Sequence, residues 1–317
     1  MIEKIAVTPY SIPESIKWLL HYIADSPGKN AGIFNMISSH YELNKAIERH
    51  YILTAIGDIM GMRSHRLVMQ SALKEFISDS DYLVGNFEGT ITEKKSAVWP
   101  ISFDERHDAA IIEELSGLFP SHKTYLCVSN NHACDFGAEE FFRSIGMLKS
   151  SGFNVFGWRD KPYCDINDNL RVISGTMWSN RKCDYIATFK MAENCTKDGA
   201  FNLLYPHIGY EFERYPRQEI VRFARKAISK FDAIVSHHPH CPQPITTEEM
   251  DSGSRLLAYS LGNFCCGSRK KILRYGIVIK IELGQNRTGK WLIGRAEWRY
   301  TECAIMRDGQ FTVKLVV

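Results

Sequence analysis

Three of the 11 histidines in the chain, His237, His238 and His240, stand within four positions at the end of an apolar run. Neutral imidazole is a common metal ligand, so this spacing predicts either a metal site or a polar loop. Pro239 disfavours helical backbone at His238, and side chains alternate between two faces in extended backbone. We therefore expect His238 and His240 to point to one side and His237 to point away.

Polar residues with metal-binding side chains also end four earlier apolar runs. In chain order they are Asp58; Asn86 and Glu88; Asn130, Asn131, His132 and Asp135; and His207 and Glu211. Each has an ordinary structural alternative, such as a turn, a helix cap or a hydrogen-bonded buried histidine. One metal site would explain all of them together, and this shared explanation favours it.

The ligand types indicate two divalent metal ions. Carboxylate, amide and imidazole groups without thiolate suit Mn, Fe, Zn or Mg, and they argue against iron–sulfur clusters and cysteine-type structural zinc. Two ions bridged by a carboxylate lower the pKa of a bound water toward about 7 and bind a phosphoryl group between them. A histidine that holds no metal can then protonate the leaving oxygen. The residues therefore favour metal-dependent phosphoryl chemistry.

Strand and helix patterns alternate along the middle of the chain. Strand patterns cover 51–58, 81–86, 124–130, 153–157, 170–176, 201–207 and 232–238, and helical patterns cover about 64–79, 106–117, 137–151 and 215–230. Alternating βαβ units predict an α/β fold with a largely parallel sheet, whose ligands bind beyond the carboxyl ends of its strands. Each of the polar groups described above stands at such an end.

The two ends of the chain differ from its middle. Residues 1–50 are predicted to be a helical extension, in which capping-box patterns at Ser11 and Ser39 open helices that run to Ala24 and about His50. Residues 51–317 are predicted to form the main domain. Strand patterns at 274–283, 290–299 and 311–317 predict a second sheet packed on the first.

The composition is that of an ordinary globular protein, with 44% hydrophobic and 24% charged residues. A net charge of +3, without arginine-rich motifs, argues against nucleic acid as a partner. No segment reads as a transmembrane helix or a secretory signal. The nine cysteines lack CxxC spacing, so we expect reduced thiols and a cytoplasmic protein.

The ordered motifs GD, NxE, NNHxxDxG, HxGxE, HPH and YSLGNF resemble those of the capsule-synthesis CapA family, which is associated with poly-γ-glutamate. This family belongs to the calcineurin-like metallophosphoesterase superfamily. The resemblance runs from about Ile52 to Phe264. It implies an α/β/β/α sandwich of two packed, largely parallel or mixed sheets, and a hydrolase of phosphoester or phosphoanhydride bonds. Its substrate would be a small phosphoester or an anionic polymer.

The resemblance also implies a role for individual residues. Asp58 and His240 would bind one ion, Asn131, His207 and His238 the other, and Glu88 would bridge them. His132 would be the general acid, and it and Asp58 are the predicted catalytic residues. Asn86 would be a further ligand or a supporting group, and the other supporting positions are Asn130, Asp135, Glu211 and Asn263.

Two features keep alternatives open. Met60 stands where the superfamily usually has a histidine, which favours a non-hydrolytic accessory protein of capsule assembly. Amide or peptide chemistry at the same metals is a further alternative, since the same centre can attack a carbonyl carbon.

Arg269 and Lys270, in GSRKKILR, could meet an anionic substrate or form a solvated hairpin.

Overall fold

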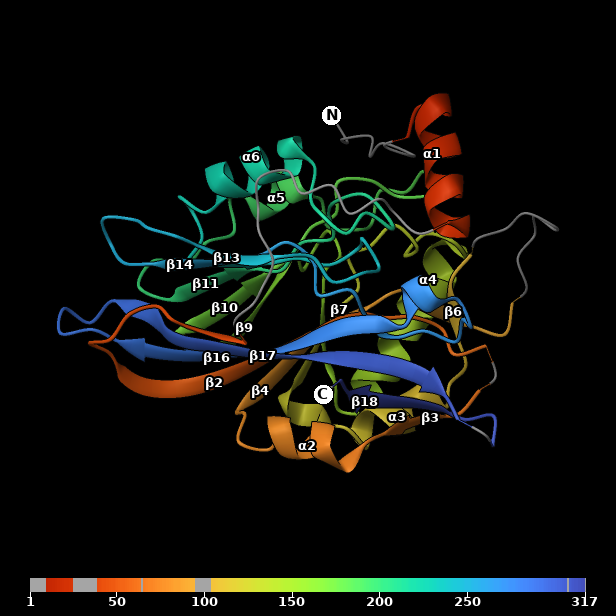
Figure 1. Cartoon of the computed structure of the whole chain (residues 1–317), viewed down its shortest axis with the longest axis horizontal. Coiled ribbons are helices and arrows are strands. Elements are labelled where there is room, and N and C mark those ends of the chain that lie inside the picture. The colour runs from red at the N-terminus through yellow and green to blue at the C-terminus, as the bar shows by residue number, and fades with distance from the viewer. Residues whose placement is uncertain (1–9, 25–38, 64, 95–103, 307, 317) are drawn as a thin grey trace.

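The computed structural model describes residues 10–24, 39–63, 65–94, 104–306 and 308–316. Two mixed β-sheets pack face to face, and helices cover their outer faces (Figure 1). The predicted α/β sandwich is therefore confirmed. None of the helices in these ranges is long and apolar enough to cross a membrane.

The larger sheet has ten strands. They are β1 (His40–Glu42), β2 (Glu48–Ile59), β3 (Leu67–Met69), β4 (Tyr82–Phe87), β7 (Thr124–Cys127), β8 (Asn154–Phe156), β15 (Asn263–Cys265), β16 (Tyr275–Gln285), β17 (Trp291–Ile305) and β18 (Phe311–Leu315). The main order is β3-β18-β17-β16-β2-β4-β7-β8, with β1 on β17 and β15 on β2. Strands β2, β4, β7 and β8 are parallel, so their carboxyl ends meet at one edge.

The smaller sheet has six strands, in the order β13-β14-β12-β11-β10-β9. They are β9 (Tyr163–Asn167), β10 (Leu170–Ile173), β11 (Phe201–Leu204), β12 (Ala233–Val235), β13 (Ile245–Glu248) and β14 (Arg255–Ala258). Strands β10, β11, β12 and β14 run parallel. A separate two-stranded sheet pairs β5 (Thr90–Ile91) with β6 (Arg106–His107).

Apolar side chains divide the molecule into four layers. Residues such as Leu53, Val84, Leu203 and Trp298 form a core between the two sheets. On the outer face of the larger sheet lie α2 (Ser71–Ile77), α3 (Ile111–Ser116) and α4 (Gly137–Ser150), and on that of the smaller sheet lie α5 (Phe189–Ala192) and α6 (Gln218–Ala227). Burial on both faces explains why the strands are continuous apolar runs rather than alternating ones.

The N-terminal prediction is correct for one helix and wrong for the other. Helix α1 (Ile12–Ile23) begins with the expected capping box, in which the backbone N–H of Ser11 donates to Glu14. The helix predicted from Ser39 to about His50 is wrong, because 40–42 and 48–50 lie in β1 and β2. Tyr41 packs on Trp298 with ring centroids 5.1 Å apart, so sheet packing outweighs the local capping pattern. The division into an extension and a main domain stays a prediction.

The predicted role of the C-terminal strands is also wrong. Strand β16 pairs antiparallel with β2 from Val278↔Ile56 to Gln285↔Glu48, and β17 and β18 follow it. The tail thus extends the first sheet, while residues 163–258 supply the second. Strand β2 needed a partner on this edge, and the sequence does not say which strand provides it.

Candidate metal centre

Six acidic and histidine side chains meet where the strands end. They are Asp58, Glu88, His207, His237, His238 and His240, hereafter the strand-end cluster. Each is at most 3% exposed to solvent. Asp58 lies on β2 and Glu88 just after β4, whereas the histidines follow β11 and β12 of the other sheet. The cluster is therefore assembled by the packing of the two sheets.

Asp58 is positioned by close approach of two backbones. Its N–H donates to the carbonyl oxygen of Gly262 at 2.9 Å, and its register partner on β4 is Asn86. A Cβ atom on the preceding residue, Gly57, would stand 1.9 Å from that same carbonyl oxygen. The glycine of the GD motif is thus required for β2 to reach the segment that contains Gly262.

Gly57→Ala is expected to displace Asp58 and to reduce both stability and metal binding. The added methyl group meets backbone rather than a movable side chain, so a destabilisation of about 1–3 kcal/mol or more is expected. Chemical unfolding and metal titration would measure both effects. Gly146→Ala on α4 is the matched control, because nothing lies within 4 Å of its added Cβ. Equal behaviour of the two variants would contradict this role for Gly57.

The HHPH segment does not have the extended backbone that we expected. His238 and His240 have positive φ angles of 109° and 57°. His237 does not point away, because its Nδ1 lies 3.0 Å from Asp58 Oδ1 and 2.9 Å from His207 Nδ1. That prediction is wrong because the backbone N–H of His238 donates to Asp58 Oδ2 at 3.0 Å, a contact distant in sequence. Such backbone strain costs about 1–3 kcal/mol per residue and is typical of functional sites.

Four groups of three side chains in the described residues have the spacing of metal ligands, with ligand atoms within 4.8 Å of one another. Two of them are Glu88 with His207 and His238, and Glu88 with Asp58 and His240. Glu88 Oε1 lies 3.9 Å from His207 Nε2 and 3.6 Å from His240 Nε2. This carboxylate thus joins both groups, as expected of a bridging ligand.

Several ligand atoms of the strand-end cluster lack hydrogen-bond partners. Among the described residues none bonds to Glu88 Oε1, His237 Nε2 or either ring nitrogen of His238. Buried polar atoms are nearly always paired. Carboxylate oxygen and imidazole nitrogen are also suitable donors for divalent transition metals. The cluster therefore fits bound metal ions.

The pKa values of the two carboxyl groups in the cluster are shifted in opposite directions. Burial opposes ionisation of Asp58, but hydrogen bonds from His237 and His240 hold its pKa well below the ordinary value. Burial and the nearby Asp58 charge raise the pKa of Glu88 well above its ordinary value. A carboxylate at Glu88 therefore needs additional positive charge nearby, which a divalent cation would supply.

His132 lies beside the cluster and is oriented by a carboxylate. Its Nδ1 is 2.6 Å from Asp135 Oδ2, and its Nε2 is 4.0 Å from Glu88 Oε1. Burial disfavours the charged imidazole, but the carboxylates of Asp135 and Glu105 outweigh it and raise the pKa of His132 to about 9. These carboxylates therefore favour the protonated ring, whose Nε2 faces Glu88 of the cluster.

Two predicted asparagines contact histidines of the cluster. Asn131 Oδ1 lies 2.7 Å from His207 Nε2, and Asn263 Oδ1 lies 3.0 Å from His240 Nδ1. Asn263 also donates to the carbonyl oxygen of Leu273 at 3.0 Å. It thus fixes the ring of His240 and ties it to the loop before β16.

Asn86 and Asn130 support the carboxylate side of the cluster. Asn86 Nδ2 donates to Asp58 Oδ1 at 2.8 Å. Asn130 Nδ2 donates to the carbonyl oxygen of Phe87 at 2.9 Å. Asn86 thus contacts a cluster residue directly, whereas Asn130 holds the chain next to Glu88.

Glu211, predicted as a supporting position, has metal-ligand spacing with two histidines. Its carboxylate and the rings of His238 and His240 form one of the four groups with metal-ligand spacing. The indole N–H of Trp18 on α1 donates to this carboxylate, and the backbone N–H of Glu211 donates to Tyr10 Oη at 2.9 Å. The N-terminal helix therefore contacts the site through Glu211.

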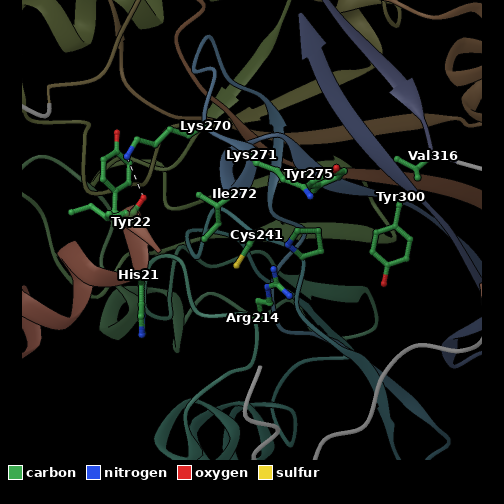
Figure 2. A pocket seen from close by; sticks show the side chains of 12 residues that line it. His21, Tyr22, Arg214, Cys241, Lys270, Lys271, Ile272, Tyr275, Tyr300 and Val316 are labelled. Atoms are coloured by element: carbon green, nitrogen blue, oxygen red, sulfur yellow. Dashed lines mark hydrogen bonds between the residues drawn. The ribbon is translucent and has the colours of Figure 1, made fainter. Parts of the chain in front are cut away.

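The two predicted substrate-binding residues, Arg269 and Lys270, differ in position, and Lys270 lies apart from the cluster. Lys270 lines a pocket of about 620 Å³ beside α1, and its ammonium donates to the carbonyl oxygen of Tyr22 at 3.2 Å (Figure 2). Arg269 is exposed and is not among the residues that line this pocket.

Asn180 is a site residue that was not predicted from the sequence. Its Nδ2 lies 3.2 Å from His132 Nδ1, and its Oδ1 accepts a hydrogen bond from Asn131 Nδ2 at 3.2 Å. It stands in the loop between β10 and α5, which carries no strand-end motif. Its partners are 48 and 49 positions away, so local patterns could not identify it.

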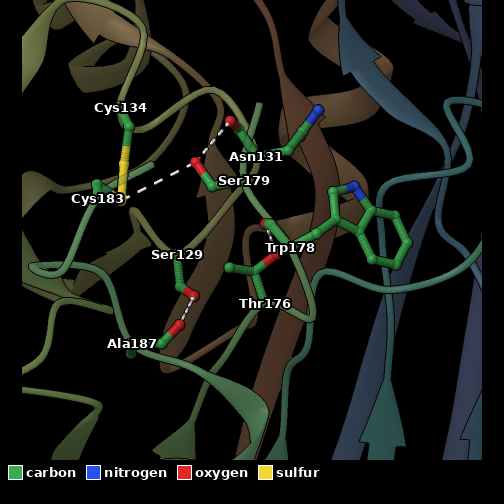
Figure 3. The surroundings of a disulfide bond; sticks show 8 residues. All are labelled: Ser129, Asn131, Cys134, Thr176, Trp178, Ser179, Cys183 and Ala187. Carbon is green, nitrogen blue, oxygen red and sulfur yellow. Dashed lines mark hydrogen bonds between the residues drawn. A yellow bond between two sulfur atoms is a disulfide. The ribbon is translucent and has the colours of Figure 1, made fainter. Parts of the chain in front are cut away.

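A disulfide joins this loop to the segment after β7 (Figure 3). It links Cys134, two residues after His132, to Cys183, three residues after Asn180. The prediction that all cysteines are reduced is therefore wrong for this pair, whereas the other seven are free thiols. The predicted cytoplasmic location, which relied partly on reduced cysteines, stays a prediction.

Reduction of the disulfide is expected to lower the free energy of unfolding by about 4 kcal/mol, because the bond closes a loop with a sequence separation of 49. Urea unfolding with and without dithiothreitol measures this difference. In the control variant Cys134→Ser/Cys183→Ser, reductant should leave the unfolding midpoint unchanged. A wild-type unfolding midpoint that does not change when reductant is added would contradict the expected contribution of the disulfide to stability.

Two proteins with related sequences are named for the biosynthesis of PGA or of a capsule. The chain is 25% identical over 234 residues to the "PGA biosynthesis protein CapA" of Bacillus subtilis (strain 168), covering 67% of this chain and 60% of that protein. It is 22% identical over 253 residues to the "Capsule biosynthesis protein CapA" of Bacillus anthracis, covering 67% and 59%. The chain thus spans about three fifths of the length of these relatives.

The family comparison covers most of the described strands and the whole strand-end cluster. Residues 39–163 and 178–268 match the family described as "Bacterial capsule synthesis protein PGA_cap". This match includes more than half of the chain, and the matched ranges contain all six motifs noted in the sequence. The chain belongs to the PGA_cap family of bacterial capsule synthesis proteins.

Proposed function

We propose that this protein hydrolyses phosphoester or phosphoanhydride bonds with two divalent metal ions held by the strand-end cluster. The observation that carries this proposal is the position of Glu88, whose carboxylate belongs to two ligand groups at once. Asp58 and His240 would hold one ion with it, and His207 and His238 the other. Bound ions would supply an activated water at neutral pH and positive charge for the phosphoryl oxygens.

The remaining residues have roles that follow from their contacts. Asp135 accepts the Nδ1 proton of His132, which leaves the Nε2 proton directed toward the cluster and available to a leaving oxygen. Asn180 contacts the same ring and restricts its rotation. His237 and the backbone N–H of His238 hold the Asp58 carboxylate in place. This division of roles resembles a general acid placed beside a metal centre.

The substrate class is proposed from the relatives and from charge. Both relatives are named for biosynthesis of a capsule or PGA. An anionic substrate, either a small phosphoester or an acidic polymer related to poly-γ-glutamate, would suit two metal ions in a site with buried histidines. We propose a role in the synthesis of such a cell-surface polymer.

Hydrolysis of bis(p-nitrophenyl) phosphate and p-nitrophenyl phosphate tests this function. Chelator-treated protein is supplied with Mn²⁺, Zn²⁺, Fe²⁺ or Mg²⁺, and release of nitrophenolate is followed. We expect turnover with at least one ion and none in His207→Ala. Metal binding without turnover of these esters or of a broader phosphate panel would refute the hydrolase.

One observation favours a second candidate, a non-hydrolytic accessory protein that binds an acidic polymer or a partner. Met60 is buried with Phe212, Cys266 and Leu273 in a small apolar cluster, where related enzymes are expected to have a metal-binding histidine. The ion held by Asp58 would then bind more weakly. Binding of poly-γ-glutamate without any phosphate hydrolysis would support this candidate. Cleavage of a γ-glutamyl peptide would instead indicate amide chemistry at the same metals.

A further inference from the structure

The pocket beside α1 is separate from the strand-end cluster but shares a wall with it. His240 belongs to the cluster, whereas the next two residues, Cys241 and Pro242, line the pocket. A second wall is the segment 270–275, which leads into β16 and which Asn263 ties to His240 through Leu273. The pocket volume of about 620 Å³ lies in the range of small-molecule sites.

Helix α1 forms the third wall and is firmly docked. Glu14 pairs with Arg217 at 2.8 Å, and Lys17 pairs with Glu213 at 3.3 Å. Tyr22 packs against Phe212 with ring centroids 5.3 Å apart. The inner face of the helix therefore holds Tyr22 at the pocket, where Figure 2 shows it beside Lys270.

The pocket combines positive charge with apolar walls. Arg214, Lys270 and Lys271 line it, and none of the described lining residues is acidic. The Lys271 ammonium has no ion pair or hydrogen bond with any described residue. Most of the remaining lining is apolar or aromatic, including Ile272 and Tyr275.

The apolar lining continues onto the outer face of α1. This face carries Ile12, Ile16, Leu19, Leu20 and Ile23, whose exposed fractions lie between 47% and 81%. Their spacing of three and four residues places them along one side of the helix. Ile23 belongs both to this row and to the pocket lining. A ligand tail could therefore leave the pocket along an apolar surface.

We propose that this pocket binds an amphipathic anion, in which a phosphate or carboxylate group is attached to an extended apolar chain. The anionic group would contact Lys271 and Lys270, and the chain would lie against Ile272, Tyr275 and Ile23. This proposal does not depend on hydrolysis at the strand-end cluster. Two sources have this chemistry, a soluble amphiphile and a lipid of a membrane surface.

Isothermal titration with octyl phosphate tests the proposal, using chelator-treated protein so that bound metal cannot hold the phosphate. We expect one binding site for octyl phosphate. Lys271→Gln should lower its affinity roughly fivefold, which is the upper end of the contribution of a solvent-exposed ion pair. Octanol and inorganic phosphate should each bind much more weakly. Butyl phosphate should bind at least about tenfold more weakly than octyl phosphate, since each fully buried methylene raises the affinity about fourfold.

Lys149→Gln, at the exposed end of α4, is the matched control and should bind octyl phosphate like the wild type. Absence of binding, equal binding by Lys271→Gln, or binding only to Mn²⁺-loaded protein would overturn the proposal. Flotation with phosphatidylglycerol and phosphatidylcholine vesicles distinguishes the two sources. Flotation with the anionic vesicles alone, lost in Lys271→Gln, identifies a membrane lipid, whereas octyl phosphate binding without flotation identifies a soluble amphiphile.

Discussion

Glu88→Gln is expected to abolish hydrolysis and to remove metal ions from both ligand groups. Glu88 Oε1 is the atom that approaches His207 and His240 at 3.9 and 3.6 Å, so its neutral amide replacement weakens both groups together. Loss of a residue that only supports a ligand costs roughly 10–100-fold. Because Glu88 is itself a proposed ligand, its replacement should have a larger effect than this. We therefore expect the Mn²⁺-dependent turnover of bis(p-nitrophenyl) phosphate to fall by more than about 1000-fold.

Metal content measured on the same samples separates this explanation from misfolding. Glu140→Gln is the matched control, since Glu140 is a nearly buried carboxylate that pairs with Arg143 on α4 outside the cluster. It should retain the metal ions and the turnover. If Glu88→Gln kept its full metal content and activity, Glu88 would not be a bridging ligand.

His132→Gln is expected to slow hydrolysis in proportion to the basicity of the leaving group. General acid catalysis contributes typically about 10²–10⁴-fold. An alkyl phosphoester, whose alkoxide must be protonated, should lose about this factor. A nitrophenyl ester should lose much less, because nitrophenolate leaves as a stable anion. Rates for both esters, measured at one Mn²⁺ concentration, test the role.

The control for this variant is His122→Gln, which changes an exposed histidine of the 3-10 helix Ser121–Lys123. It should leave both rates unchanged. An equal loss for the two esters in His132→Gln, together with loss of metal, would indicate that His132 only supports the structure of the site.

Much of the site could be predicted because parallel strands bring their carboxyl ends to one edge. Asp58, Glu88 and His207 follow apolar runs whose strand identity is evident from composition alone. The packing of the two sheets then brings these ends together. In this chain, the location of a polar residue at the end of a strand indicated the site better than any single residue type.

Other features depend on contacts that no local pattern contains. The positive φ of His238 is associated with a hydrogen bond to Asp58, 180 positions away, and it turns His237 into the cluster. Likewise Cys134 is bonded to a cysteine 49 positions away, and Asn180 contacts a histidine 48 positions away. The capping pattern at Ser39 was outweighed by pairing of β1 with β17.

The most direct test of the central claim is the metal content of the purified protein, measured by mass spectrometry after exposure to Mn²⁺ or Zn²⁺ and removal of free ions. The proposed site predicts two equivalents per chain, lost in Glu88→Gln and retained in Glu140→Gln. If the wild-type protein held no ion after this treatment, the strand-end cluster would not be a metal centre and the proposed hydrolase would be refuted.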